Sequence, residues 1–217
     1  MKILVVGGSR GTGAAVVRTL AADGHLVTAF ARSASSAGLG EHGVVAFDGD
    51  VMDADDLGKA MIGQDAVVVT LGISDNPLKV QYLRRASTPL DIRSAGTRRV
   101  VEAMQSAGLR RLVVQTVYGL GEGRRHLDLK WKLIFGLLLR PQIRDSAVQE
   151  QVVRESGLDW TLVRPVALTD EETTAPAHVD AQDERLGLQV ARAQVARVFA
   201  DVVDEPTSVG KTLSVSS

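Results

Sequence analysis

Short apolar runs alternate with helical patterns along the whole chain. Apolar residues at helical spacing predict helices over Thr12–Ala22, just after Asp53, over Asp91–Ala107 and over Asp145–Ser156. The runs between them are too short for helices and rich in Val, Leu and Thr, so they predict strands. These strands are Lys2–Val6, Leu26–Phe30, Val44–Phe47, Ala66–Thr70, Arg111–Gln115 and Trp160–Val163, with Lys211–Val215 as a candidate seventh.

This alternation predicts an α/β fold in which a doubly wound parallel sheet carries helices on both faces, a Rossmann fold. The expected strand order is 3-2-1-4-5-6, and a ligand is expected at the carboxyl ends of the strands, between the first and the fourth. No linker divides the chain, so residues 1–217 are expected to form one domain, with substrate-side segments around 120–141 and 166–190. The polar stretch Thr169–Glu184 is predicted to be a mobile loop.

Composition removes several classes of function. The 25 Lys and Arg residues balance 26 Asp and Glu residues, so no basic excess indicates a nucleic acid partner. The absence of cysteine excludes disulfides and thiol catalysis, and it fits an expected cytoplasmic location. The opening "MKILVVGG" predicts a strand and not a targeting segment. No apolar run reaches the roughly 20 residues of a membrane span, and no pair of the four histidines has metal-ligand spacing, so neither a span nor a metal is expected.

Three glycines, Gly7, Gly11 and Gly13, stand where the first strand gives way to the first helix. A phosphate needs backbone N–H groups at close range, and glycine removes the Cβ that would keep it away. The helix that follows adds free N–H donors and the positive end of its dipole. A plain tight turn is the alternative, but the strand before and the helix after favour a dinucleotide site.

The loop "VGGSRGTG", at Val6 to Gly13, resembles the short-chain dehydrogenase/reductase (SDR) superfamily, with Val6 where that family has threonine. The stretches "FDGD", "VVVTLG", "GTRRVVEAM" and "SGLDWTLVRP" resemble its atypical branch, which includes the NmrA-like proteins and the biliverdin/flavin reductases. The resemblance covers nearly the whole chain and implies NAD(P)H binding. It implies a cofactor-binding set of Gly7, Ser9, Arg10, Gly11, Thr12, Gly13, Asp50 and Val51 at the adenine, Leu71 and Gly72 beside the ribose, Thr116 near the nicotinamide ribose, and Pro165.

The end of the second predicted strand bears on which dinucleotide binds. An acid there would accept hydrogen bonds from the ribose of NAD, but the sequence reads "AFARSAS", with Arg32 and Ser33 instead. A guanidinium can hold a phosphate with two charge-assisted hydrogen bonds. Arg10 can approach the same 2′-phosphate from the loop, so the sequence predicts NADP(H).

The usual catalytic pair of the SDR family is missing. In that family a lysine four residues after a tyrosine lowers the tyrosine pKa, whereas the alignment places Gln142 and Ser146 at these positions. The family's serine falls on Thr116 or Val117, with Val117 preferred. Either the acceptor needs no side-chain acid, or another residue donates the proton.

Two residues are candidate donors. Tyr118, beside Thr116 at the end of a strand, is the first catalytic candidate, and His126, four residues before Lys130, is the second. A packed aromatic residue and a surface histidine are the plain alternatives.

The stretch "KWKLIFGLLLRP", Lys130–Pro141, is too short to span a bilayer. A substrate pocket is the first interpretation, a subunit interface the second and a membrane-surface segment the third, and an ordinary buried helix competes with all of them. The expected function is an NADPH-dependent oxidoreductase that reduces a small apolar or aromatic acceptor (a flavin, quinone or carbonyl compound). The alternative is a non-catalytic NADP(H)-binding redox sensor of the NmrA-like type. A small-molecule substrate is the expected partner, and a homodimer is left open.

Overall fold

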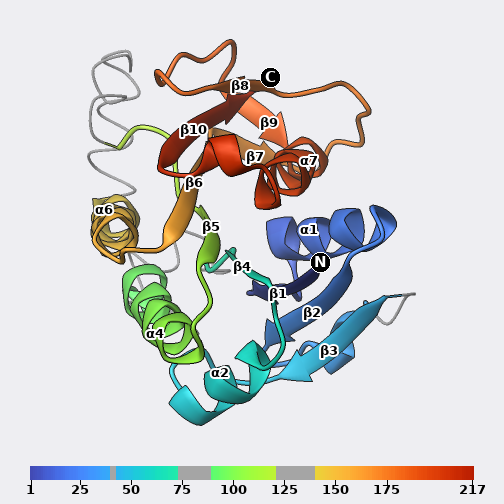
Figure 1. The fold of residues 1–217 in the computed structure, drawn as a ribbon. Helices are drawn as coiled ribbons and strands as arrows, with labels where there is room; N and C mark the ends of the chain where they lie inside the picture. Colours follow the sequence, from blue (N-terminus) through green and yellow to red (C-terminus); the bar gives the residue numbers. More distant parts are fainter. Residues whose placement is uncertain (40–42, 73–88, 121–139) are drawn as a thin grey trace.

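The computed structural model describes residues 1–39, 43–72, 89–120 and 140–217. Its main sheet has eight strands in the order β3-β2-β1-β4-β5-β6-β10-β8 (Figure 1). Neighbours are parallel except for β10 and β8. The predicted order of the first six strands is therefore confirmed. The candidate seventh strand, Lys211–Val215, forms as β10 and lies beside β6. The strands are β3 Val44–Asp48, β2 Leu26–Ala31, β1 Lys2–Val6, β4 Ala66–Val69, β5 Arg111–Gln115, β6 Asp159–Pro165, β10 Lys211–Ser216 and β8 His178–Asp180.

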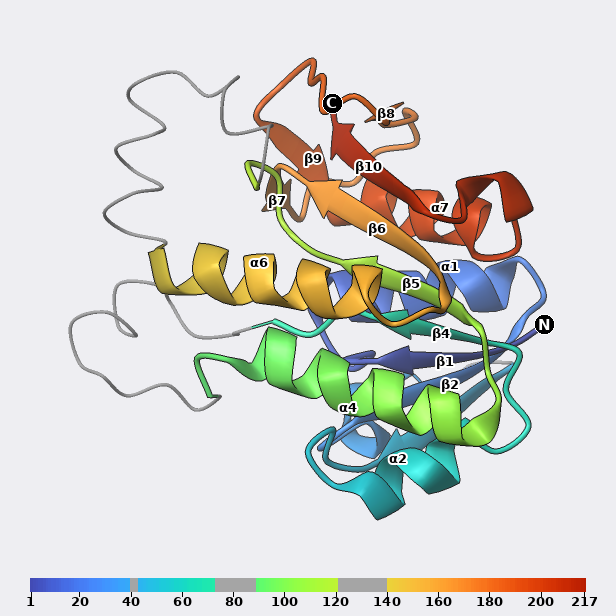
Figure 2. The same cartoon turned by 60° about the vertical axis from the view of Figure 1, so that its left-hand side comes forward.

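Helices cover both faces of this sheet (Figures 1 and 2). On one face lie α1 (Gly11–Ala22) and α7 (Arg192–Val203), and on the other lie α2 (Ala54–Met61), α4 (Ile92–Ala107) and α6 (Arg140–Arg154). The short helices η1 (Ser35–Ala37) and η3 (Pro206–Ser208) lie in connections.

Alternation along β1 produces two cores, because successive side chains of a strand point to opposite faces. Ile3 and Val5 belong to the cluster under α1 and α7, while Leu4 and Val6 belong to the cluster under α2, α4 and α6. All four side chains are fully buried, and each such burial contributes roughly 1.5–3 kcal/mol. The apolar strand runs of the sequence are thus explained by a sheet that is covered on both sides.

Local sequence signals predict the start of α2 correctly but not the start of α6. Asp53 caps α2 as its sequence position suggests, because its side chain accepts hydrogen bonds from the backbone N–H groups of Asp55 and Asp56. Helix α6 begins at Arg140, five residues before the predicted start at Asp145. Pro141 lies in its first turn, where a helix tolerates proline because the missing N–H has no partner there anyway.

The region after β6 departs most from the prediction. It contains β7 (Ala167–Thr169) and β9 (Gln189–Ala191), which form a separate two-stranded sheet, and then helix α7. The stretch Thr169–Glu184 is not only a loop, because β8 lies within it and pairs with β10 through Val179 and Val215. Three-residue strands show no period of their own, and their partners lie far away along the chain, so local patterns miss them.

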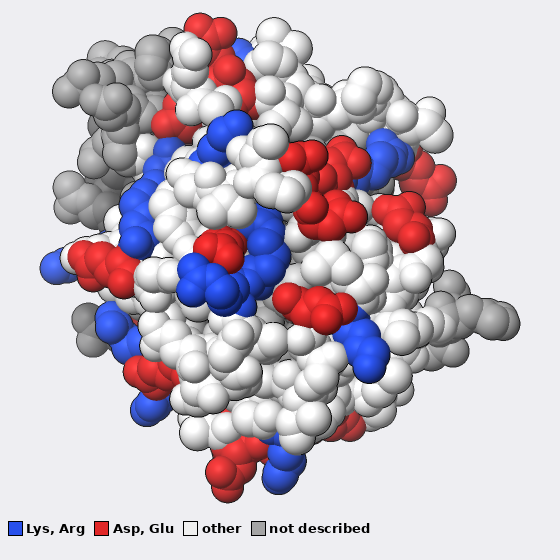
Figure 3. Space-filling view, in the orientation of Figure 1, with Lys and Arg blue, Asp and Glu red and all other residues white. Residues whose placement is uncertain are grey.

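Charged side chains of both signs are interspersed over the face seen in Figure 3. Among the described residues, no helix has both the length and the apolar character that crossing a bilayer requires. Most of the Lys130–Pro141 stretch, together with His126, lies outside the described residues.

Candidate cofactor-binding site

The predicted cofactor residues gather at one edge of the sheet. The parallel strands β1 to β6 all end at this edge, and each of the predicted residues stands at or just after one of those ends. The glycine loop follows β1, Arg32 follows β2, Asp50 follows β3, Gly72 follows β4 and Thr116 follows β5. Pro165 is the last residue of β6. In open parallel sheets this edge is where ligands bind.

Close backbone packing explains two of the three loop glycines. A Cβ on Gly13 would lie 2.1 Å from the carbonyl oxygen of Gly7 and 2.6 Å from Oγ1 of Thr70, distances that real Cβ atoms do not show. Gly7 has φ +87° and donates its N–H to the carbonyl oxygen of Phe30 at 2.9 Å. The start of α1 is therefore pressed against the ends of β1 and β4, in a space that a side chain would fill.

The N-terminus of α1 is open to a ligand. Its N-cap residue is Arg10, in extended conformation, and within the described part of the chain no side chain caps the helix. The first N–H groups of a helix have no partner inside it, and they carry the positive end of its dipole. Gly11 is exposed at this point, so this end of α1 has the donors that a diphosphate requires.

Sequence reasoning missed one cation at this helix end. Arg192, the first residue of α7, places its Nε 3.5 Å from the position that a Cβ would take on Gly11. Its guanidinium pairs with Asp170 at 2.5 Å, and that carboxylate is 87% exposed. Arg192 lies far from the loop in sequence, and no local pattern marks it; only the packing of α7 against α1 brings it there.

Two further arginines stand free near the ends of β1 and β2. Arg10, Arg32 and Ser33 are all exposed, and neither guanidinium has a partner among the described residues. The turn after Arg32 is held by Asp48, whose carboxylate accepts hydrogen bonds from the N–H and hydroxyl of Ser35. The same Ser35 contacts hold the pKa of Asp48 below its ordinary value. The carboxylate of Asp48, the residue opposite Ala31 in the sheet, is thus engaged by Ser35.

The ends of β3 and β4 carry the next predicted residues, with β3 at the outside of the sheet and β4 next to β1. Asp50 is exposed and accepts a hydrogen bond from the N–H of Met52, while Val51 is buried. Val51 and Leu71 both pack over Gly96 of α4, where a Cβ would lie 2.7 Å from Cδ1 of Leu71. Gly72 follows on the surface. Among the described residues, no group of three His, Asp or Glu side chains is placed to hold a metal.

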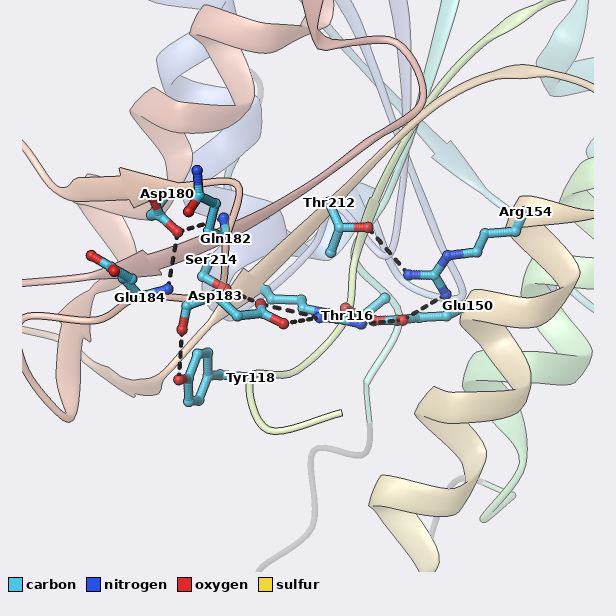
Figure 4. Close-up of polar contacts among 11 residues, drawn as sticks. Thr116, Tyr118, Glu150, Arg154, Asp180, Gln182, Asp183, Glu184, Thr212 and Ser214 are labelled. Carbon is cyan, nitrogen blue, oxygen red and sulfur yellow. Dashed lines mark hydrogen bonds and ion pairs between the residues drawn. The ribbon is translucent and has the colours of Figure 1, made fainter. Parts of the chain in front are cut away.

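At the ends of β5 and β6, the two predicted catalytic hydroxyls are already engaged. Buried Thr116 donates to Oε1 of Glu150 at 2.9 Å, and buried Tyr118 donates to the carbonyl oxygen of Asp183 at 2.9 Å (Figure 4). Burial raises the pKa of Tyr118, which is the opposite of what the family's lysine does for its tyrosine. These contacts favour the packed aromatic residue over the proton donor. Pro165 is buried beside them and accepts from the N–H of Tyr118.

A buried ionic network surrounds Thr116. Glu150 accepts two hydrogen bonds from Arg164, at 2.7 and 2.8 Å, and one from Arg154 at 2.8 Å. Arg164 also pairs with Asp183 at 2.8 Å, and Ser214 donates to the same carboxylate (Figure 4). Burial raises the pKa of Glu150, but Arg164 and then Arg154 outweigh it and leave that pKa below its ordinary value. The network fixes the segment after β8 to β6 and β10.

The positions of the missing dyad lie in α6. Ser146 is fully buried, and its Oγ accepts a hydrogen bond from Nη1 of Arg93 at 3.4 Å. The side chain of Gln142 lies outside the described residues, and so does Tyr82. Val117, the residue aligned with the family's serine, is partly exposed.

Comparisons with known proteins identify the family and the fold. A model of the NAD(P)H-binding family matches residues 7–206, so the chain belongs to that family. An uncharacterized chloroplastic protein of Arabidopsis thaliana is 24% identical over 99% of this chain and 76% of its own length.

Two solved structures extend the likeness. The anaerobilin reductase ChuY of Escherichia coli O157:H7 is 24% identical, with a TM-score of 0.78 over 99% of this chain and 96% of that one. A short-chain dehydrogenase/reductase of Veillonella parvula, solved with NADP, is 16% identical, with a TM-score of 0.79 over 100% and 94%. These neighbours show an SDR-like Rossmann fold and belong to an oxidoreductase-like group.

Proposed function

We propose that this protein is an NADPH-dependent reductase that acts on a small apolar or aromatic acceptor, such as a flavin, a quinone or a carbonyl compound. The observation that carries the proposal is the open N-terminus of α1, pressed against the ends of β1 and β4 where Gly13 leaves no room for a Cβ. Membership of the NAD(P)H-binding family supports the dinucleotide. Gly7, Gly11 and Gly13 would border its diphosphate, with Arg192 beside them.

The preference for NADPH rests on charge at the end of β2. Arg10 and Arg32 are exposed and have no partner among the described residues, so they are available to a 2′-phosphate. Asp48, the acid nearby, is engaged by Ser35. A guanidinium that binds a phosphate makes charge-assisted hydrogen bonds, which are about twice as strong as neutral ones.

In this proposal the bound cofactor supplies a hydride, and the chain contributes mainly position. The ends of β4 and β5 hold the reacting partners together, and such proximity alone can lower a barrier by several kcal/mol, up to roughly 7–11. The hydroxyl of Thr116 donates to Glu150, and that of Tyr118 donates to the carbonyl oxygen of Asp183. The proton that completes the reduction therefore comes from water, which suits an acceptor ring that needs no side-chain acid.

The same engaged hydroxyls favour a second candidate, a redox sensor that binds NADP(H) without turnover. The test is to incubate the pure protein with NADPH and FMN, or with small quinones, and to follow absorbance at the NADPH band. Consumption well above the protein-free rate supports the reductase. Tight NADPH binding with no consumption across the panel supports the sensor.

A further inference from the structure

The guanidinium of Arg93, a partly buried cation, lies next to the substrate end of the proposed site. Arg93 is the second residue of α4, and its Nη2 lies 3.6 Å from the position that a Cβ would take on Gly72, just past the end of β4. Its Nη1 reaches Ser146 of α6. The guanidinium thus lies between α4, α6 and the end of β4, on the side of the sheet opposite α1.

The guanidinium of Arg93 makes few hydrogen bonds to the part of the chain that the structure describes. Of its five N–H donors, one has a partner within the described residues, the hydroxyl of Ser146 at a long 3.4 Å. The Nε is buried and has no hydrogen-bond partner among the described residues. A polar atom that is buried without a hydrogen bond is costly, so the bare Nε of this partly exposed guanidinium favours a ligand here.

The neighbouring acid does not supply the missing contacts. Asp145 is buried beside Arg93, but its two carboxylate oxygens accept hydrogen bonds from the backbone N–H groups of Arg93 and Ser94, each at 3.1 Å. Asp145 therefore caps α4, and its hydrogen bonds within the described residues go to the helix backbone and not to the guanidinium donors. Burial lowers the pKa of Arg93, and the charge of Asp145 only partly opposes this.

We propose that Arg93, with the hydroxyl of Ser146, binds a carboxylate group of the acceptor. A guanidinium presents its donors as a planar fork, which matches the two oxygens of a carboxylate. The phosphates of the cofactor would lie at the ends of β1 and β2, so they do not compete for this group. The inference rests on the proposed function, because it places the substrate at the end of β4. It narrows the substrate to an apolar or aromatic molecule that carries an acid.

The test is calorimetry with matched probes on the full chain. Benzoate and 1-naphthoate are titrated against their neutral amides, with and without NADP⁺, so that each pair differs only in the carboxylate. We expect the acids to bind at least tenfold more tightly than the amides. Equal binding of acids and amides to the wild-type protein would overturn the proposal, and so would inorganic phosphate binding as tightly as the acids.

Variants assign the preference to one side chain. Arg93→Met should abolish it, whereas Arg98→Met, which removes an exposed arginine from the same helix, should keep it. Retention of the preference in Arg93→Met refutes the role of Arg93. If Arg93→Met fails to melt cooperatively, Ser146→Ala and Arg93→Lys replace it, and each should reduce the preference severalfold; no reduction in either refutes the site. If the wild-type protein does not bind NADPH, the proposed function is refuted. The comparison of acids with amides without NADP⁺ still tests the carboxylate site separately.

Discussion

Replacing Gly13 by alanine tests the close approach on which the cofactor site depends. The added Cβ would lie 2.1 Å from the carbonyl oxygen of Gly7, about 1.3 Å short of the 3.4 Å at which ordinary contacts begin. The carbonyl belongs to the backbone and a Cβ is bonded directly to it, so neither can rotate away. The start of α1 must instead move off the ends of β1 and β4.

The expected size of the effect follows from two opposing terms. Overpacking of this kind costs about 3 kcal/mol at the upper end of its usual range. Alanine in place of glycine inside a helix returns about 1 kcal/mol. The net loss is about 2 kcal/mol, which lowers the Tm of a chain of this size by roughly 4–8 °C. Because the displaced N–H groups no longer face the diphosphate, we expect at least a tenfold loss of NADPH affinity.

Gly58→Ala is the matched control. Gly58 is exposed in α2, and nothing lies within 4 Å of the position of its Cβ. This variant keeps the gain in helix propensity without the clash, so its Tm should rise by about 2–4 °C and its NADPH affinity should not change. Thermal melting and calorimetry measure both quantities. A Gly13→Ala protein as stable as Gly58→Ala, with unchanged NADPH affinity, would refute the reasoning.

Four other substitutions separate the roles of the charged and hydroxyl groups. Arg32→Ala should weaken NADPH by about 1–3 kcal/mol and NADH much less, and equal losses in calorimetry would disprove its contact with the 2′-phosphate. Arg192→Ala should weaken the binding of both dinucleotides alike, since they share the diphosphate. Weaker binding of NADPH alone would contradict a contact between Arg192 and the diphosphate. Tyr118→Phe should cost about 1 kcal/mol of stability and leave any rate of NADPH oxidation within threefold of the wild-type rate. Abolished turnover would instead identify Tyr118 as the proton donor. Glu150→Gln should cost about 3 kcal/mol at pH 7, because it breaks a buried ion pair. The folded-state pKa of Glu150 lies below its ordinary 4.5, so this stabilisation is present above pH 4.5 and lost as pH falls through the folded value. Denaturant melts at several pH values should show that the difference in unfolding free energy between wild type and variant becomes smaller below pH 4.5. A difference that stays constant with pH would contradict the network.

The order of the first six strands could be predicted because the sheet is buried on both faces. Each of its strands needs an apolar run, and each run is bounded by a helix or a glycine, so chain order and handedness leave little choice. The positions of the glycine loop and Arg32 could also be predicted, because they directly follow the first two strands of the chain.

Contacts between distant segments could not be predicted. Arg192 lies at the start of α1 only because α7 packs there. Asp145, from the distant helix α6, accepts hydrogen bonds from the backbone N–H groups of Arg93 and Ser94. Thr116 and Tyr118 were correctly placed at the end of β5, but their partners Glu150 and Asp183 come from later segments. Side-chain spacing along one element carries no information about such partners.

The central claim is that the open end of α1 binds the diphosphate of NADPH. Titrating NADPH and NADH into the wild-type protein by isothermal calorimetry tests it most directly. We expect one site per chain, with NADPH bound at least tenfold more tightly than NADH. No detectable binding of either dinucleotide would contradict it.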